Sequence, residues 1–242
     1  MGTLINILAI LLGSLIGTLL GNRLPEKMSR TLTDAMGLVV LVIGALNLAS
    51  LSDSEFKLAT GVIPTILVVL ASLLLGGITG SLLNIEGRLE QFGDYLQRKT
   101  KSKGEKERFI QGFVNASLLF SIGPMAILGA LQDGLGQGFD ILTLKSTLDG
   151  FTSIAFSATM GWGVAFSAIP VGLWQGLLTL LSMTLGAVLS NALISAITAT
   201  GGILLLGTGL RLLQLRMVAV ADLLPALVFA PLITLWLASL GL

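Results

Sequence analysis

The stretch from residue 3 to residue 22, TLINILAILLGSLIGTLLGN, contains no ionisable side chain and is almost wholly apolar. About 20 such residues, each rising 1.5 Å along a helix, cross the hydrocarbon core of a bilayer. A secretory signal peptide carries positive charge before its apolar run, whereas the first cation here, Arg23, follows the run. The stretch therefore predicts a transmembrane helix that is retained.

Similar apolar runs recur along the rest of the chain. The chain is 54% hydrophobic and only 11% charged, whereas about a quarter of the residues of an ordinary globular domain are charged. The sequence predicts a single all-α membrane domain, a polytopic bundle of about eight spans. Seven spans also fit, because little more than Pro170 separates the fifth and sixth runs. After the first, the runs lie near residues 35–51, 61–84, 109–131, 148–169, 171–194, 199–216 and 223–241.

The basic residues orient the spans. All but Lys57 and Lys145 follow the first or third run or lie at the end of the seventh, and so gather at alternate connections of the chain. Lysine and arginine are retained on the cytoplasmic side, so both termini are expected outside the cytoplasm. The polar segment 85–108 carries Leu89, Phe92 and Leu96 at helical spacing, which predicts an amphipathic helix along the inner leaflet. The alternative is a docking site for a partner or for anionic lipid.

The residue types exclude several functions. The chain has no Cys and no His, which removes thiolate and imidazole metal sites and the usual nucleophile–base pairs. Its net charge of +1 gives no argument for nucleic acid. We expect no enzyme, no metal and no cofactor.

A repeated pattern links the two ends of the chain. Gly13, Gly17 and Gly21 are four residues apart, and the same spacing recurs 169 positions later. The later ridge is Ser182, Gly186 and Ser190. Small residues four apart let helices pack closely in lipid, and we assign both ridges to helix packing.

The second and seventh runs agree in the same way, with Gly37 and Gly44 matching Gly202 and Gly209. Segments 1–84 and 171–242 are therefore predicted to form an inverted repeat of three helices each. The repeats would flank a central helix pair, 109–169, with 85–108 as a cytoplasmic linker. Inverted repeats are typical of secondary transporters.

The central pair holds the candidate solute or ion path. The fourth run is interrupted at Gly123–Pro124, where proline frees backbone groups. The fifth run carries a polar stripe with a four-residue period, which predicts one shared face. The alternative to a solute path is a purely structural role, with an ion pair at the outer end of this run and serines bonded to their own helix. No acid is expected near mid-membrane. The path residues are Asn115, Ser117, Ser121, Gly123, Pro124, Lys145, Asp149, Ser153 and Ser157.

Several motifs carry a family resemblance. The runs 121–135, 145–151 and 161–170, together with the opening GTLIN at 2–6, resemble the uncharacterised bacterial inner-membrane family typified by YdfK and YqgA. The resemblance implies a multi-pass protein of the bacterial cytoplasmic membrane. It supplies no substrate and no catalytic residues, because the family is a domain of unknown function with predicted transport at most.

These observations favour a membrane transporter for a small neutral or anionic solute, working by alternating access. The expected partners are the lipid bilayer, a small solute, a monovalent ion and further copies of the chain. An oligomeric channel with its pore between subunits and a non-transport membrane scaffold remain as alternatives.

Overall fold

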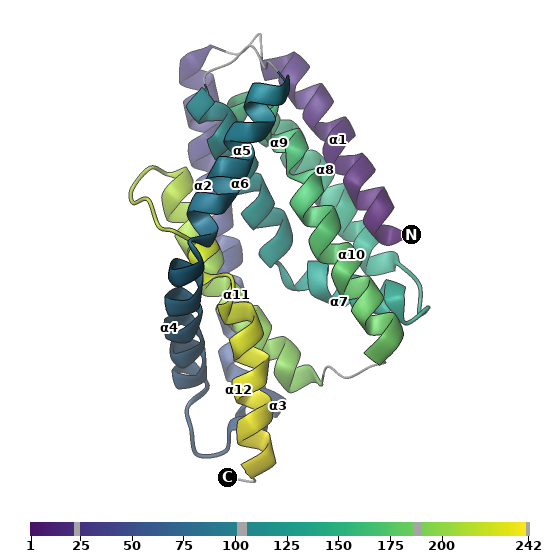
Figure 1. Cartoon of the computed structure of the whole chain (residues 1–242), viewed down its shortest axis with the longest axis vertical. Helices are drawn as coiled ribbons and strands as arrows, with labels where there is room; N and C mark the ends of the chain where they lie inside the picture. The colour runs from purple at the N-terminus through teal and green to yellow at the C-terminus, as the bar shows by residue number, and fades with distance from the viewer. Residues whose placement is uncertain (22–24, 101–105, 186–189, 241–242) are drawn as a thin grey trace. The chain divides into compact units, whose positions relative to one another are not determined.

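The computed structural model describes residues 1–21, 25–100, 106–185 and 190–240, which contain helices and turns but no strand (Figure 1). In chain order the helices are α1 (Gly2–Gly21), α2 (Glu26–Asn47), η1 (Leu48–Ser52), α3 (Ser54–Thr60), α4 (Thr65–Leu83), α5 (Ile85–Thr100), α6 (Lys106–Ile122), α7 (Pro124–Gly134), α8 (Asp140–Met160), α9 (Gly163–Phe166), α10 (Ala168–Leu185), α11 (Asn191–Leu212), η2 (Ala221–Leu223) and α12 (Ala226–Leu240). The predicted all-α class is confirmed.

Six helical segments in the described residues are long and apolar enough to cross a membrane. Helices α6 and α7 form one further broken span, or a re-entrant loop, since they are bent by 61° at the predicted break. Helix α8 is not among these candidates because ionisable and hydroxyl side chains occupy much of its length. That α8 is an eighth span stays a prediction. The six segments are Gly2–Gly21, Lys27–Ser52, Thr65–Leu83, Gly163–Met183, Asn191–Leu212 and Val220–Leu240.

Several helix boundaries differ from the predicted ones. The second and seventh predicted runs, 35–51 and 199–216, are shorter than the others, but they belong to the 22-residue helices α2 and α11. The run expected at 148–169 is instead α8, which begins at Asp140 and ends at Met160. The predictions followed apolar content, whereas a helix continues through polar residues whose backbone hydrogen bonds still close.

The chain divides into two compact units. Unit 1 comprises residues 1–36 and 88–187, and unit 2 comprises residues 37–87 and 188–242. In unit 1, α1 packs along α8, and each predicted glycine of α1 lies against the α8 backbone. A Cβ on Gly13, Gly17 or Gly21 would meet the carbonyl oxygen of Gly150, Ile154 or Ala158, respectively. Because the contacts advance together along both helices, α1 and α8 run parallel.

The second predicted ridge is only partly within α10. Ser182 is buried in α10 and donates to the carbonyl of Thr179 at 2.9 Å. Ser190 is the N-cap of α11 rather than part of α10, because a new helix starts where the sequence suggested one continuous span. Gly186 and the basic residues Arg23, Lys101 and Lys103 lie outside the described residues.

In unit 2, two pairs of helices pack through glycine. Helix α4 meets α12 where a Cβ on Gly76 would lie 2.7 Å from the Cα of Ala226. Helix α2 meets α11 at Gly44, whose added Cβ would lie 2.8 Å from the Gly202 carbonyl oxygen. Both pairs are antiparallel, since residues later in one helix contact residues earlier in the other.

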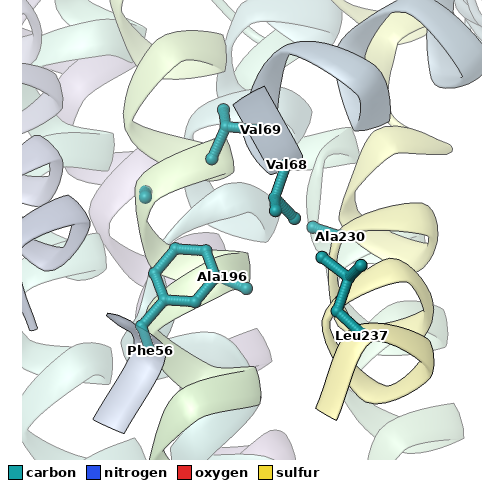
Figure 2. Packing of buried hydrophobic residues seen from close by; sticks show 7 residues of the cluster. Phe56, Val68, Val69, Ala196, Ala230 and Leu237 are labelled. Atoms are coloured by element: carbon teal, nitrogen blue, oxygen red, sulfur yellow. The ribbon is translucent and has the colours of Figure 1, made fainter. Parts of the chain in front are cut away.

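A small apolar core lies between α3, α4, α11 and α12 of unit 2. Phe56 and Val69 are fully buried there, and Figure 2 shows the two side chains with Val68, Ala196, Ala230 and Leu237. The alanines leave room for the phenylalanine ring. Many leucines elsewhere on these helices are exposed, such as Leu74 and Leu82 of α4, and they provide the surface that lipid covers.

Candidate functional site

The polar stripe of the predicted path lies on α8 and is buried in unit 1. Lys145, Asp149, Ser153 and Ser157 are each at most 8% exposed. The stripe faces α1 at Ser153, whose Cβ lies 3.1 Å from a Cβ built on Gly13. Because α1 packs closely along α8, α1 is one neighbour of the stripe, and α6, within the fourth predicted run, is another.

Lys145 and Asp149 form the predicted ion pair. The pair does not lie at the outer end of its helix, as expected, because α8 begins at Asp140 and places Asp149 at its middle. Helix α8 is not among the candidate spans, so the expectation that no acid lies near mid-membrane stays a prediction. The Lys145 Nζ is also 5.9 Å from the centre of the Phe120 ring on α6.

Two amide side chains that sequence reasoning missed complete a polar cluster around this pair. Asn6 of α1 donates to the Gln175 Oε1 of α10 at 3.2 Å, and its side chain also lies beside Asp149. Both amides are fully buried. Gln175 lies near the middle of the candidate span Gly163–Met183. A signal was available, since Asn6 and Gln175 are 169 positions apart, the same shift that relates Gly13 to Ser182.

The predicted residues of α6 are less closely joined to this cluster. Asn115 and Ser117 are buried, and Ser117 donates to the carbonyl of its own helix at Phe113, 2.6 Å away. Ser121 is half-buried. Aromatic rings also join α6 to α8, where the ring centres of Phe120 and Phe156 are 6.3 Å apart.

The break between α6 and α7 is built as the sequence predicted. Gly123 adopts an extended conformation and is the N-cap of α7, with Pro124 as the first helical residue. The Gly123 carbonyl accepts a hydrogen bond from the Ala126 amide at 3.0 Å. Pro124 suits the first helical position because it needs no amide partner there.

Several buried polar atoms of unit 1 have no hydrogen-bond partner in the described residues. Leaving such an atom unsatisfied typically costs about 1–3 kcal/mol, so a cluster of them in one unit suggests a place for a polar ligand. Apart from Asp94 Oδ1 on α5, which has Lys106 Nζ 2.8 Å away, they come from the four helices α1, α6, α8 and α10. The atoms are Oγ1 of Thr3, Oδ1 of Asn6, Oγ of Ser14, Oδ1 of Asn115, Oγ of Ser153, Oγ of Ser157, Nε1 of Trp174, Nε2 of Gln175 and Oγ1 of Thr179.

Unit 2 contains a different charged cluster, which joins the start of α5 to η2. The Glu86 carboxylate pairs with Arg211 and accepts from the Ala221 amide at 2.8 Å. In return, the Glu86 amide donates to Asp222 Oδ1 at 2.8 Å. Arg211, counted from the sequence as a basic residue of a connection, is buried in α11. These bonds join residues of unit 2 to one another, and we assign the cluster to structure. No group of three or more metal-ligating side chains occurs in the described residues.

These features define a polytopic α-helical membrane protein with a buried polar cluster between its helices. The chain belongs to the family described as "Protein of unknown function (DUF554)", which matches residues 1–235. It is similar to the "Uncharacterized membrane protein YdfK" of Bacillus subtilis (strain 168), at 31% identity over 100% of this chain and 98% of the relative. It is also similar to the "Uncharacterized protein YqgA" of Escherichia coli (strain K12), at 33% identity over 98% of each chain. No solved structure matches.

Proposed function

We propose that this protein is a carrier rather than an enzyme, and that it moves a small neutral or anionic solute across the bacterial inner membrane by alternating access. The observation that carries the proposal is the buried cluster of unit 1, in which an ion pair, two amides and unpartnered hydroxyls are buried among long apolar helices. Polar groups are expensive inside a membrane and are retained there for function. The break at Gly123 supplies the unwound backbone that carriers use near a solute.

The helix contacts support an inverted repeat within each unit. In unit 2 a shift of 165 positions carries Leu41 to Leu206 and Gly44 to Gly209. A Cβ on Gly44 would lie 3.1 Å from Leu206, and one on Gly209 would lie 2.6 Å from Leu41. The shift thus exchanges the two contacts, as a two-fold axis between antiparallel copies requires.

Unit 1 offers one contact of the same kind, because Asn6 and its bonded partner Gln175 are repeat-equivalent positions. Residue pairs that change places under the repeat suit a carrier whose inward-open and outward-open states are related by the same two-fold symmetry.

The position of Asp149 bears on which ion is coupled to transport. With α8 taken as a span, the carboxylate at its middle favours proton coupling, since intramembrane acids serve as proton relays. A monovalent cation is the second choice, because Ser153 and Ser157 present oxygen ligands in the same stripe.

Counterflow in proteoliposomes tests the carrier proposal. Proteoliposomes that contain the purified protein would be loaded in turn with unlabelled amino acids, monosaccharides, monocarboxylates and dicarboxylates. Uptake of the same solute in labelled form would be followed. Saturable accumulation of one solute supports a carrier. Discrete current steps in a planar bilayer, with no counterflow, favour the oligomeric channel.

Site variants sharpen this test. Asp149→Asn and Asn115→Leu keep the side-chain size and should lower the counterflow rate. The matched control is Ser146→Ala, which removes a buried α8 hydroxyl already bonded to the Leu142 carbonyl at 2.6 Å. Wild-type rates in both site variants would remove the site. The non-transport scaffold is the better function if no solute moves and if neutralising Arg98, Lys99 and Lys106 abolishes the effect of the protein in cells.

A further inference from the structure

We infer that Asn6 and Gln175 select the solute, and that it carries no net charge while both donating and accepting hydrogen bonds. This inference rests on the proposed carrier function and narrows its solute class from neutral or anionic to uncharged. A zwitterionic amino acid and a neutral amide share the required chemistry.

The first step is the hydrogen-bond inventory of the two amides. The Asn6 amide nitrogen donates to Gln175 Oε1 at 3.2 Å. Asn6 Oδ1 remains without a partner, as does Gln175 Nε2. The cluster therefore keeps one free acceptor and one free donor on two fully buried side chains. A solute that supplies one donor and one acceptor satisfies both atoms.

The second step is charge. Lys145 and Asp149 are the ionised groups of this cluster, and they pair with each other. Their charges cancel, and no third ionisable residue is linked to this cluster by a hydrogen bond or ion pair in the described part of unit 1. A solute with net charge would enter a buried site without a counter-charge, and its desolvation would oppose binding. An uncharged or zwitterionic solute avoids this penalty.

The third step is position. Asn6 and Gln175 come from α1 and α10, the first helices of the two predicted repeats, and they are related by the repeat shift of 169. A site built from equivalent residues of two inverted copies can present the same groups to either side of the membrane. Gln175 also lies near the middle of its candidate span, where carriers bind solute.

Equilibrium binding to the purified full-length protein in lipid nanodiscs tests the inference. The probes are glycine as a zwitterion, acetamide as a neutral amide, acetate as an anion and methylammonium as a cation. We expect glycine or acetamide to bind and the two ions not to bind. Asn6→Leu and Gln175→Met should each weaken binding by about tenfold or more, since each leaves a buried polar group of the solute unpaired. Ser146→Ala should not change it.

Charge variants keep the test decisive if the apolar variants fail to fold. Asn6→Asp and Gln175→Glu preserve shape and add a negative charge, so binding should shift from glycine or acetamide to methylammonium. Binding of acetate by the parent protein, no binding of glycine or acetamide, or unchanged affinity in the amide variants would overturn the inference. Counterflow of an anionic solute that persists in those variants would leave the carrier proposal standing while this inference falls.

Discussion

Glycine 17 illustrates how a single residue sets the packing of unit 1. A Cβ at this position would meet the Ile154 carbonyl oxygen and lie 2.9 Å from the Ile154 Cα. Gly17→Ala should therefore push α1 from α8 and lower the free energy of unfolding by about 1–3 kcal/mol. Unfolding in mixed detergent micelles measures this change.

Gly176 of α10 is the matched control, because a Cβ there has nothing within 4 Å. Gly176→Ala should be neutral or slightly stabilising, since alanine is the better helix former. Equal losses in both variants would mean that the α1–α8 contact does not depend on close backbone approach.

The Lys145–Asp149 pair makes a second prediction at the scale of single residues. Removing one partner leaves a buried, uncompensated charge, so Lys145→Met or Asp149→Leu alone should destabilise the protein by about 3–5 kcal/mol. The double variant should lose less than either single variant, because no isolated charge remains. Unfolding measurements on all four proteins of this double-mutant cycle would give the coupling, and strictly additive losses would contradict it.

At the scale of elements, the bend between α6 and α7 is expected to be functional. Gly123→Ala with Pro124→Ala restores an amide donor and removes the proline clash, so the two helices can continue through residue 123. No atom obstructs a Cβ at Gly123. The double variant should fold normally and lose counterflow by about tenfold or more, because small displacements of solute-binding groups lower rates steeply. Pro231→Ala in α12 makes the same chemical change inside another helix and should retain transport.

Helix α5 is held at its C-terminal half by Asp94, which bonds to Lys106 at 2.8 Å and Arg98 at 2.7 Å. Chiefly the hydrogen bond from Lys106 holds the pKa of the Asp94 carboxyl below its ordinary value of 3.8. Because the folded-state pKa is lowered, the stabilisation is complete above pH 3.8 and is lost as the pH falls through the lowered value.

Asp94→Asn should therefore increase the mobility of a spin label on Gln91→Cys at neutral pH. The difference between variant and parent should disappear below the lowered pKa. The effect should be small and weakened by salt, since the Arg98 and Lys106 side chains are exposed. A difference that grows with acidity would contradict this account.

Elements set by local sequence patterns could be predicted, whereas features set by long-range contacts could not. The break at Gly123–Pro124 and the helix 85–100 were predictable, because proline chemistry and the spacing of Leu89, Phe92 and Leu96 act locally. The start of α8 at Asp140 was missed, since apolar content alone does not report polar helical turns. Asn6 and Gln175 were missed because their meaning depends on a contact between residues 169 positions apart.

At the scale of the whole molecule, the distribution of charge predicts the topology. Both termini and the connection 135–139 are expected outside the cytoplasm, and α5 inside, because the basic residues gather in alternate connections. The chain has no cysteine, so one introduced cysteine reports its own side without background. Gln137 and Lys99 are exposed and suit this purpose.

Gln137→Cys should react with a membrane-impermeant maleimide in intact cells, whereas Lys99→Cys should react only after the membrane is permeabilised. The result also bears on the number of spans, because α8 must cross the membrane for residues 99 and 216 to share a side in the eight-span arrangement. Arg216→Cys should therefore behave like Lys99→Cys. Suppose that Arg216→Cys is labelled in intact cells while the other two variants behave as expected. The chain would then cross the membrane an odd number of times between residues 99 and 216, and α8 would not be a span.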